Sequence, residues 1–231
     1  MNEQENIDNK FKTNSKNVFF ILVAMIASAV ILAFLIQLLL KNSKINQGKY
    51  RVSDAIITSQ TEFIDKSKET GTWSYDVYQS NSLSLLVSAG AEISRAYISD
   101  IHASKSSIEI SQQNSDIAVF ANEEAVLELA SDVSEDGEIL YEINIKNKGA
   151  LNNFEISSDV NEIKHDATIF KLANITNSDL QFDISFDFNI QEKDGRLSVM
   201  TVQLKLPYKD IIESGSSVTR IDVGDLVFKL K

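Results

Sequence analysis

The side chains best suited to chemistry in this chain are two histidines, His102 and His165, because the chain contains no cysteine. Asp100 lies two residues before His102, and Asp166 follows His165 directly. An Asp–His pair beside a serine supplies the groups of a nucleophilic triad. Hydrolases of the α/β class hold that serine on a strained G-x-S-x-G turn, a motif that the sequence lacks. We therefore predict that neither histidine is catalytic and that the protein is not an enzyme.

One acidic segment carries oxygen atoms at a spacing that calcium loops use. Asp132, Ser134 and Asp136 would occupy positions 1, 3 and 5, and Gly137 position 6. Position 12 falls on Ile143, where a calcium loop requires a bidentate glutamate. The segment lies between two apolar runs, so we interpret it as a solvated hairpin turn. Two scattered histidines do not make a zinc site either, and we expect no metal and no cofactor.

Other candidate residues concern contact rather than catalysis. Trp73, Tyr75 and Tyr78 would form a binding patch if they were exposed, although aromatic residues in a strand usually belong to the core. Asn174-Ile175-Thr176 matches the acceptor pattern for N-glycosylation, which matters only in a compartment that glycosylates proteins. Neither signal identifies a ligand.

The strongest signal is an uncharged apolar run, VFFILVAMIASAVILAFLIQLLL, from Val18 to Leu40. As a helix it would be about 34 Å long, enough to cross a hydrocarbon core of roughly 30 Å. A buried helix of a soluble domain would keep a polar stripe. The small residues Ala27 to Ala29 match a signal-peptide cleavage site, but the run is longer than the apolar region of a signal peptide. We predict an uncleaved transmembrane anchor over residues 18–40.

The residues in and around this run predict how the anchor would behave. Small residues four positions apart let two helices approach closely, so a homo-oligomer is an option. Basic residues flank both ends, so the positive-inside rule does not decide the orientation. A short basic tail before the first apolar run favours a cytoplasmic N-terminus, which would leave the C-terminal part outside the cytoplasm. The candidate helix–helix contacts are Ala24, Ser28, Ala29 and Ala33, and the juxtamembrane basic residues are Lys41, Lys44, Lys49 and Arg51.

Charge and composition divide the rest of the chain. The polar tail, residues 1–17, has no periodic apolar pattern and is predicted to be disordered. Residues 41–49 are predicted to be a basic juxtamembrane linker. Residues 52–231 carry 15 basic and 30 acidic side chains, a balance of −15 within a whole-chain charge of −11. An acidic balance of this size argues against nucleic acid as a partner.

From residue 50 onward apolar residues mostly alternate, which is the period of half-buried strands. Gln181–Ile190 alternates without a slip, and the Asp194-Gly195 pair predicts a hairpin. The return strand, Leu197–Leu206, changes phase at Val199 and Met200, which predicts a bulge or a stretch that is apolar on both faces. Residues 50–68 fit helix and strand equally poorly. The other predicted strands are Trp73–Gln79, Leu83–Val87, Ile93–Ile101, Ser107–Ser111, Ile117–Ala121, Val126–Ala130, Glu138–Lys146, Phe154–Ser157, Thr168–Leu172 and a last strand through Leu226, Phe228 and Leu230.

About a dozen strands are more than the seven of one Ig-like sandwich. We therefore predict a mainly β protein with one large or two small Ig-like antiparallel β-sandwich modules, and we favour two, over residues 50–122 and 123–231. The stretch Tyr141–Gly149, followed by Phe154–Ser157, resembles the unit of strand, Asn-x-Gly turn and strand in bacterial and archaeal cell-surface Ig-like repeats. This resemblance bears on the fold only.

These expectations point to a function in binding. We expect a single-pass protein of the cell membrane that displays an acidic, extracytoplasmic β-sandwich as an accessory module of the cell envelope. Its partners would be the lipid bilayer and another membrane or envelope protein. The alternative is a structural subunit of a surface filament or secretion apparatus, in which the apolar helix would pack in a bundle.

Overall fold

Antiparallel strands make up most of the chain that this computed structural model describes, namely residues 47–69, 72–88, 93–130, 132–133, 138–157 and 168–231. Three strands are long: β1 (Gln47–Glu69), β2 (Thr72–Ser88) and β8 (Glu138–Ser157). The other strands are β3 (Ile93–Ala103), β4 (Ile108–Gln112), β5 (Ala118–Phe120), β6 (Leu127–Leu129), β7 (Asp132–Val133), β9 (Phe182–Glu192), β10 (Leu197–Leu206), β11 (Ser216–Arg220) and β12 (Val227–Leu230). Three short helical turns complete the described elements: α2 (Thr168–Leu172), α3 (Asn177–Leu180) and the 3-10 turn η1 (Val223–Asp225).

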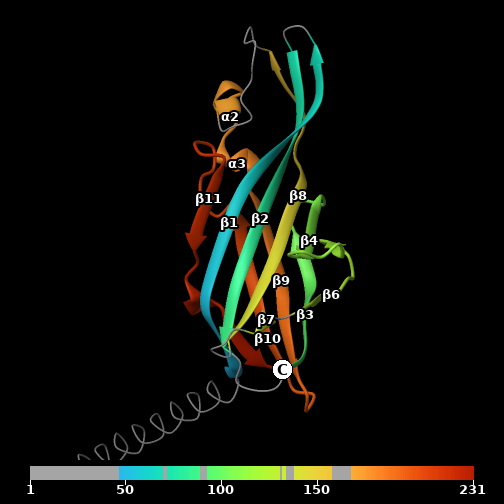
Figure 1. The fold of residues 1–231 in the computed structure, drawn as a ribbon, viewed down its shortest axis with the longest axis vertical. Helices are drawn as coiled ribbons and strands as arrows, with labels where there is room; N and C mark the ends of the chain where they lie inside the picture. The colour runs from blue at the N-terminus through green and yellow to red at the C-terminus, as the bar shows by residue number, and fades with distance from the viewer. Residues whose placement is uncertain (1–46, 70–71, 89–92, 131, 134–137, 158–167) are drawn as a thin grey trace, which may run out of the picture. The chain divides into compact units, whose positions relative to one another are not determined.

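All twelve strands belong to one sheet, in the order β5-β4-β8-β2-β1-β12-β10-β9-β3-β6, with β11 beside β1 and β7 beside β8. The sheet is strongly curled, so that its two ends approach each other (Figure 1). Gln112 of β4 links the two ends: its side chain donates to the carbonyl of Ala130 at 2.8 Å and accepts from the amide of Ala130 at 2.7 Å. The sheet therefore forms a nearly closed cylinder.

The prediction of mainly antiparallel β structure is confirmed, but two separate modules are not formed. Strand β8 lies between β4 and β2, and β9 lies beside β3, so strands from residues 50–122 and 123–231 alternate in the same sheet. Residues 47–231 accordingly make up one compact unit. The alternation of apolar residues sets which face of each strand is buried, but it does not determine which strands pair.

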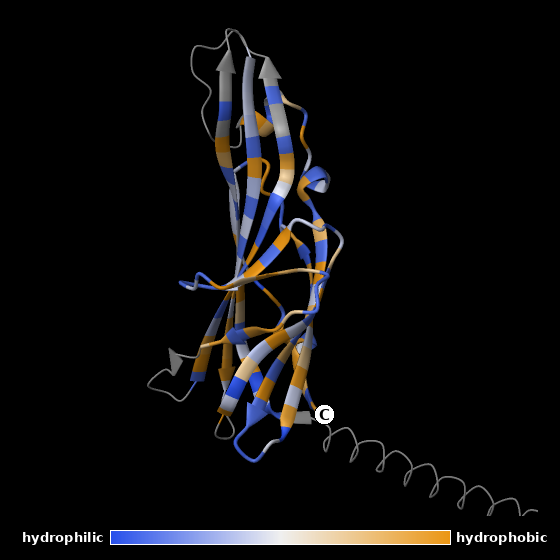
Figure 2. Cartoon of the chain, turned by 90° about the vertical axis from the view of Figure 1, so that its right-hand side faces the viewer, coloured by the Kyte–Doolittle hydropathy of each residue, from blue (hydrophilic) through white to orange (hydrophobic). Residues whose placement is uncertain are grey.

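Apolar and polar residues alternate along the strands, as Figure 2 shows, and the apolar set faces the interior of the cylinder. The pairing of β1 with β2 shifts twice, between Val52 and Asp54 and between Asp65 and Ser67. Tyr50 and Val52 point inward before the first shift, and Ala55 and Ile57 point inward after it. A bulge of this kind inserts one residue and reverses the phase. It explains why residues 50–68 fit neither period, although they form one strand.

The hairpin between β9 and β10 is confirmed, with Gly195 at φ +89° in the turn. The bulge predicted at Val199 and Met200 is absent, because β9 and β10 pair without a register shift. Ser198 takes an inward position in phase with Met200, and this buried polar residue made the apolar pattern look shifted.

Strand β8 shows that the Asn-x-Gly segment was misinterpreted. The chain continues as a strand through Asn147 and Gly149, and the predicted strands 138–146 and 154–157 are two parts of β8. Between the pairs Gln79–Asn147 and Val77–Leu151, three residues of β8 face Tyr78 alone. The segment is therefore a bulge in a long strand, and the resemblance to the Ig-like turn does not hold. Strands 73–79 and 83–87 are likewise one strand, β2.

Residues Thr168–Leu172 form the helical turn α2 instead of the predicted strand. Ile169 and Phe170 are both fully buried, although they are adjacent. A strand would direct neighbouring side chains to opposite faces, whereas a helical turn separates them by about 100° and can bury both.

No helix among the described residues is long and apolar enough to cross a membrane. The predicted membrane helix, residues 18–40, lies outside the described residues, as do its contact residues Ala24, Ser28, Ala29 and Ala33 and the basic residues Lys41 and Lys44. Lys49 and Arg51 belong to β1, so the predicted linker ends earlier than expected, where this strand begins at Gln47.

Candidate functional site

Among the described residues, His102 does not take part in a nucleophilic triad. His102 lies near the end of β3 with its side chain exposed, and its imidazole makes no hydrogen bond to a described residue. The Asp100 carboxylate instead accepts from the Ser99 hydroxyl at 3.4 Å. His165 and Asp166 lie outside the described residues.

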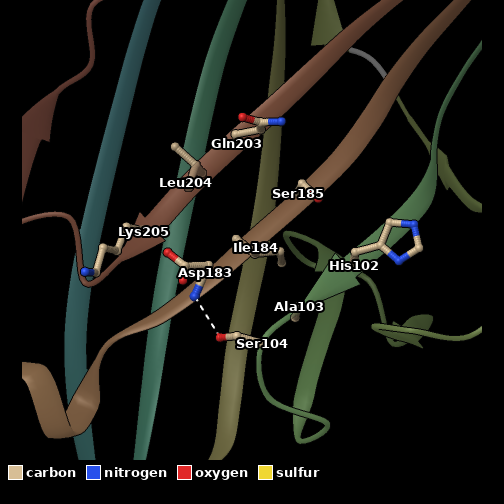
Figure 3. A pocket seen from close by; sticks show the side chains of 9 residues that line it. All are labelled: His102, Ala103, Ser104, Asp183, Ile184, Ser185, Gln203, Leu204 and Lys205. Carbon is tan, nitrogen blue, oxygen red and sulfur yellow. Dashed lines mark hydrogen bonds between the residues drawn. The ribbon is translucent and has the colours of Figure 1, made fainter.

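His102 lines a hollow of about 530 Å³ on the outer face of β3, β9 and β10 (Figure 3). In this view its imidazole is directed away from Asp183. The Ser104 hydroxyl accepts from the Asp183 amide at 2.9 Å, and the Ser104 amide donates to the Asp183 carbonyl at 2.9 Å. Ser104, directly after β3, is therefore hydrogen-bonded to the backbone of β9.

The remaining sequence candidates are dispersed. Tyr75 is fully buried and Trp73 stacks on it, with ring centroids 6.4 Å apart, whereas Tyr78 lies on the outer face of β2, where Lys146 lies over its ring. Odd and even positions of a strand face opposite sides, so these three residues do not form a patch. Asn174 is exposed with φ +56°, just before α3. Residues 134–137 of the acidic segment lie outside the described residues and connect β7 to β8, which pair as a hairpin.

An ion cluster at the start of β1 includes one of the predicted juxtamembrane basic residues. Glu192 is 3% exposed; its carboxylate lies 3.4 Å from the Lys49 ammonium and 2.8 Å from the Arg196 guanidinium. Burial, and then the negative charge of Glu192, raises the pKa of the Tyr50 phenol to about 12. Lys49 therefore forms an ion pair with another residue of the sheet unit. The only sequence signal for this ion cluster was that Glu192 follows Ile190 in the same inward phase of β9.

A second hollow, of about 550 Å³, lies on the outer face of β1, β2, β8 and β4; we call it the polar groove. Its floor is the central strand β2, which presents three successive outward serines. Longer side chains on the neighbouring strands form its walls. Antiparallel pairing aligns the side chains in rows across the strands: Thr58, Ser82, Asn144 and Ser111 in one row, and Gln60, Ser80, Lys146 and Glu109 in the next.

The charged side chains of the polar groove have partners within the sheet. The Lys146 ammonium lies 3.2 Å from the Glu62 carboxylate, and the Lys148 ammonium lies 2.5 Å from that of Glu109. The Gln113 amide, oriented with its nitrogen toward Glu142, donates to both carboxylate oxygens at 3.0 Å. Lys146 also lies over the ring of Tyr78, 5.4 Å from its centroid, where a cation and an aromatic face attract each other.

Directly behind the polar groove, the inner faces of β1, β2 and β8 carry buried polar residues. The Gln79 amide donates to Asn81 at 3.2 Å, and the Asn81 amide donates to the Ile145 carbonyl at 3.2 Å. Asn147 accepts from the Ser107 hydroxyl at 2.8 Å. These residues separate the main hydrophobic cluster from a smaller cluster around Val77, Ala150, Phe170, Leu180 and Ile211.

Sequence reasoning missed the polar groove and the polar layer behind it. In the sequence, the outward serines of β2 look like those of any solvated strand face. They form the floor of a groove only because β1, β8 and β4 lie beside β2 in the folded sheet. Ser80, Ser82 and Ser84 alternate without interruption, which was the available signal.

The described residues contain no group of three or more histidine, aspartate or glutamate side chains placed to hold a metal ion. Comparison with family models, curated proteins and solved structures gives no match for this chain.

Proposed function

We propose that this protein is a membrane-anchored binding module of the cell envelope, with the sheet unit displayed outside the cytoplasm. The uncharged apolar run of residues 18–40 supports the anchor, because its length matches the hydrocarbon core of a bilayer. The acidic balance of residues 52–231 supports a unit that stays off anionic lipid headgroups. The non-enzymatic character remains part of the proposal.

The observation that carries the binding role is the polar groove. Its volume of about 550 Å³ lies in the range of ligand sites, and its lining is mostly polar, which suits a polar ligand. The groove is built on three long strands, with β1 and β8 both paired to β2 between them, so its side chains are held by a continuous part of the sheet. A rigid surface loses little conformational entropy when it binds, which favours recognition.

Fractionation of cells that produce the full chain tests the anchor and its orientation. We expect the chain to stay in the membrane pellet after an alkaline carbonate wash, and residues 47–231 to be digested when protease is added to intact spheroplasts. Release by carbonate would contradict the anchor. Full protection from protease, with digestion after lysis, would contradict the orientation.

Binding of the purified full chain to isolated cell envelopes tests the module. We expect saturable binding that weakens in Ser82→Leu, which fills the polar groove with an apolar side chain. Gln203→Leu, on the outer face of β10, is the matched control and should bind as the native chain does. Equal binding by all three proteins would contradict a role for the groove.

A second candidate, a subunit of a surface filament or secretion apparatus, is favoured by exposed apolar side chains around β5. Ile117 is 70% exposed, and Phe120 and Val126 are about half exposed. Covering such apolar side chains with another protein lowers the free energy, because it removes apolar surface from water. For this candidate, light scattering and electron microscopy of the full chain in detergent should show ordered polymers. The Ile117→Lys variant should not form them. A single monomeric species would exclude the filament.

A further inference from the structure

We propose that the polar groove binds an uncharged oligosaccharide. This inference rests on the proposed binding function and names the class of ligand. It follows from three properties of the groove: its shape, its hydrogen-bonding groups and the way its charges are paired.

The shape suits a narrow, extended ligand. Small side chains line the outer face of β2 at three successive outward positions, Ser80, Ser82 and Ser84. At the rise of a strand, the distance from Ser80 to Ser84 is about 13 Å, and the floor of the groove has this length. The strands that carry the walls, β1 and β8, lie on either side of β2, about 10 Å apart at the usual spacing of strands. A trough of this form admits a chain of single rings and excludes a bulky folded surface.

The hydrogen-bonding groups of the trough match hydroxyls. Each serine hydroxyl both donates and accepts, and so does the amide of Asn144. The hydroxyls of Ser80, Ser82 and Ser84 make no hydrogen bond to a described residue and are available to a ligand. A ligand that carries a hydroxyl on each ring can satisfy such a row reciprocally. An apolar ligand would leave these groups desolvated and unpaired, which costs free energy.

The charges disfavour an anionic ligand. Lys146 and Lys148 are paired with Glu62 and Glu109, and Glu142 accepts from the Gln113 amide. An anionic ligand would have to compete with the two carboxylates for these lysines. An anion would also be repelled by the acidic unit as a whole, which carries −15. A neutral polyol can bind to the hydroxyls and leave the ion pairs intact.

Tyr78 extends the trough at the end beyond Ser80. It follows in the same outward phase of β2, its ring is half-buried, and the Lys146 ammonium lies on one side of the ring. The ring is therefore held in place beside the hydroxyl row by this cation–π contact. In the proposed complex, the C–H face of a terminal sugar ring packs against Tyr78 while its hydroxyls reach the serines.

Saturation-transfer NMR and calorimetry on the full chain test this inference, in a phosphocholine detergent because that headgroup carries no sugar. The probes are three neutral hexasaccharides, maltohexaose, cellohexaose and fully N-acetylated chitohexaose, with an oligogalacturonate as the anionic comparison. We expect at least one neutral probe to bind, and Ser82→Leu to weaken its affinity by about tenfold or more, since filling the trough removes several hydrogen bonds. Gln203→Leu should change the affinity by less than about twofold.

Asn144→Ala is a milder second variant, and circular dichroism confirms that each variant keeps its sheet. Asn144→Ala should also weaken binding. Failure of all three neutral probes to bind, preferential binding of the anionic probe, or equal affinity in Ser82→Leu and the native chain would overturn the inference. Membrane retention and groove-dependent binding to envelopes would survive that result, so failure of this inference is distinguishable from failure of the proposed function.

Discussion

Phe188 lies at the centre of the aromatic contacts of the main hydrophobic cluster. Its ring centroid is 4.9 Å from that of Tyr141 and 5.7 Å from that of Phe228, and its side chain is fully buried. Phe188→Ala should therefore lower the free energy of unfolding by about 3 to 5 kcal/mol, through lost burial and the cavity that remains. Urea unfolding followed by circular dichroism measures this. Lys205→Ala, on an exposed position of β10, should change it by less than about 0.5 kcal/mol.

For single residues, the sequence predicted which side chains are buried better than it predicted which side chains contact each other. Inward positions such as Ile143 and Phe186 follow directly from alternation. Glu192 and Lys49 are 143 residues apart, and nothing in the local sequence of either indicates that they pair. The same holds for the groove serines, whose role depends on the strands beside them.

Gly149 lies in the bulge of β8, close to Ser107. A Cβ atom at this position would lie 2.8 Å from the Ser107 hydroxyl oxygen, closer than such atoms approach. Gly149→Ala should displace this hydroxyl from the buried Asn147, to which it donates, and destabilise the protein by about 1 to 2 kcal/mol. In a Ser107→Gly background the added penalty should be clearly smaller. Equal penalties in both backgrounds would show that the close approach is not the cause.

At the start of α3, the Asp179 carboxylate accepts from the amide and the hydroxyl of Thr176 at 2.8 and 2.7 Å. The hydroxyl bond, and then the amide bond, holds the pKa of Asp179 below its ordinary value of 3.8. A lowered folded-state pKa contributes stability above the unfolded-state pKa, and this contribution is lost as the pH falls through the folded-state value. Asp179→Asn should therefore be less stable than the native chain near neutral pH, and this difference should disappear in strong acid. Urea unfolding from about pH 7 to about pH 2 checks this; a difference that persists in strong acid would contradict it.

Element types were predictable where the period was regular, as in β9, β10 and the first part of β8. They were not predictable where a bulge shifted the phase of β1, or where α2 buries two adjacent residues. The position of a bulge depends on how the strand pairs with another strand. The local sequence alone therefore does not predict it.

For the whole molecule, one interleaved sheet predicts one cooperative unfolding transition. Strands β1, β2 and β8 run from the main hydrophobic cluster past the buried polar layer to the smaller cluster, so neither cluster can lose its strands alone. In urea, the fluorescence of Trp73, the single tryptophan, and the circular dichroism of the sheet should change together. Two separated transitions would instead support the two modules expected from the sequence.

The amino-acid sequence alone determined that this protein has a long uncharged apolar run, an acidic remainder without cysteine, and a chain dominated by alternating strands. Each of these is a property of composition or of a local period. The tertiary structure alone decided that the strands form one nearly closed sheet, that Glu192 meets Lys49, and that three serines become the floor of a groove. Those outcomes depend on pairing between strands far apart in the chain, and side-chain alternation directs each strand to a face without selecting its neighbour.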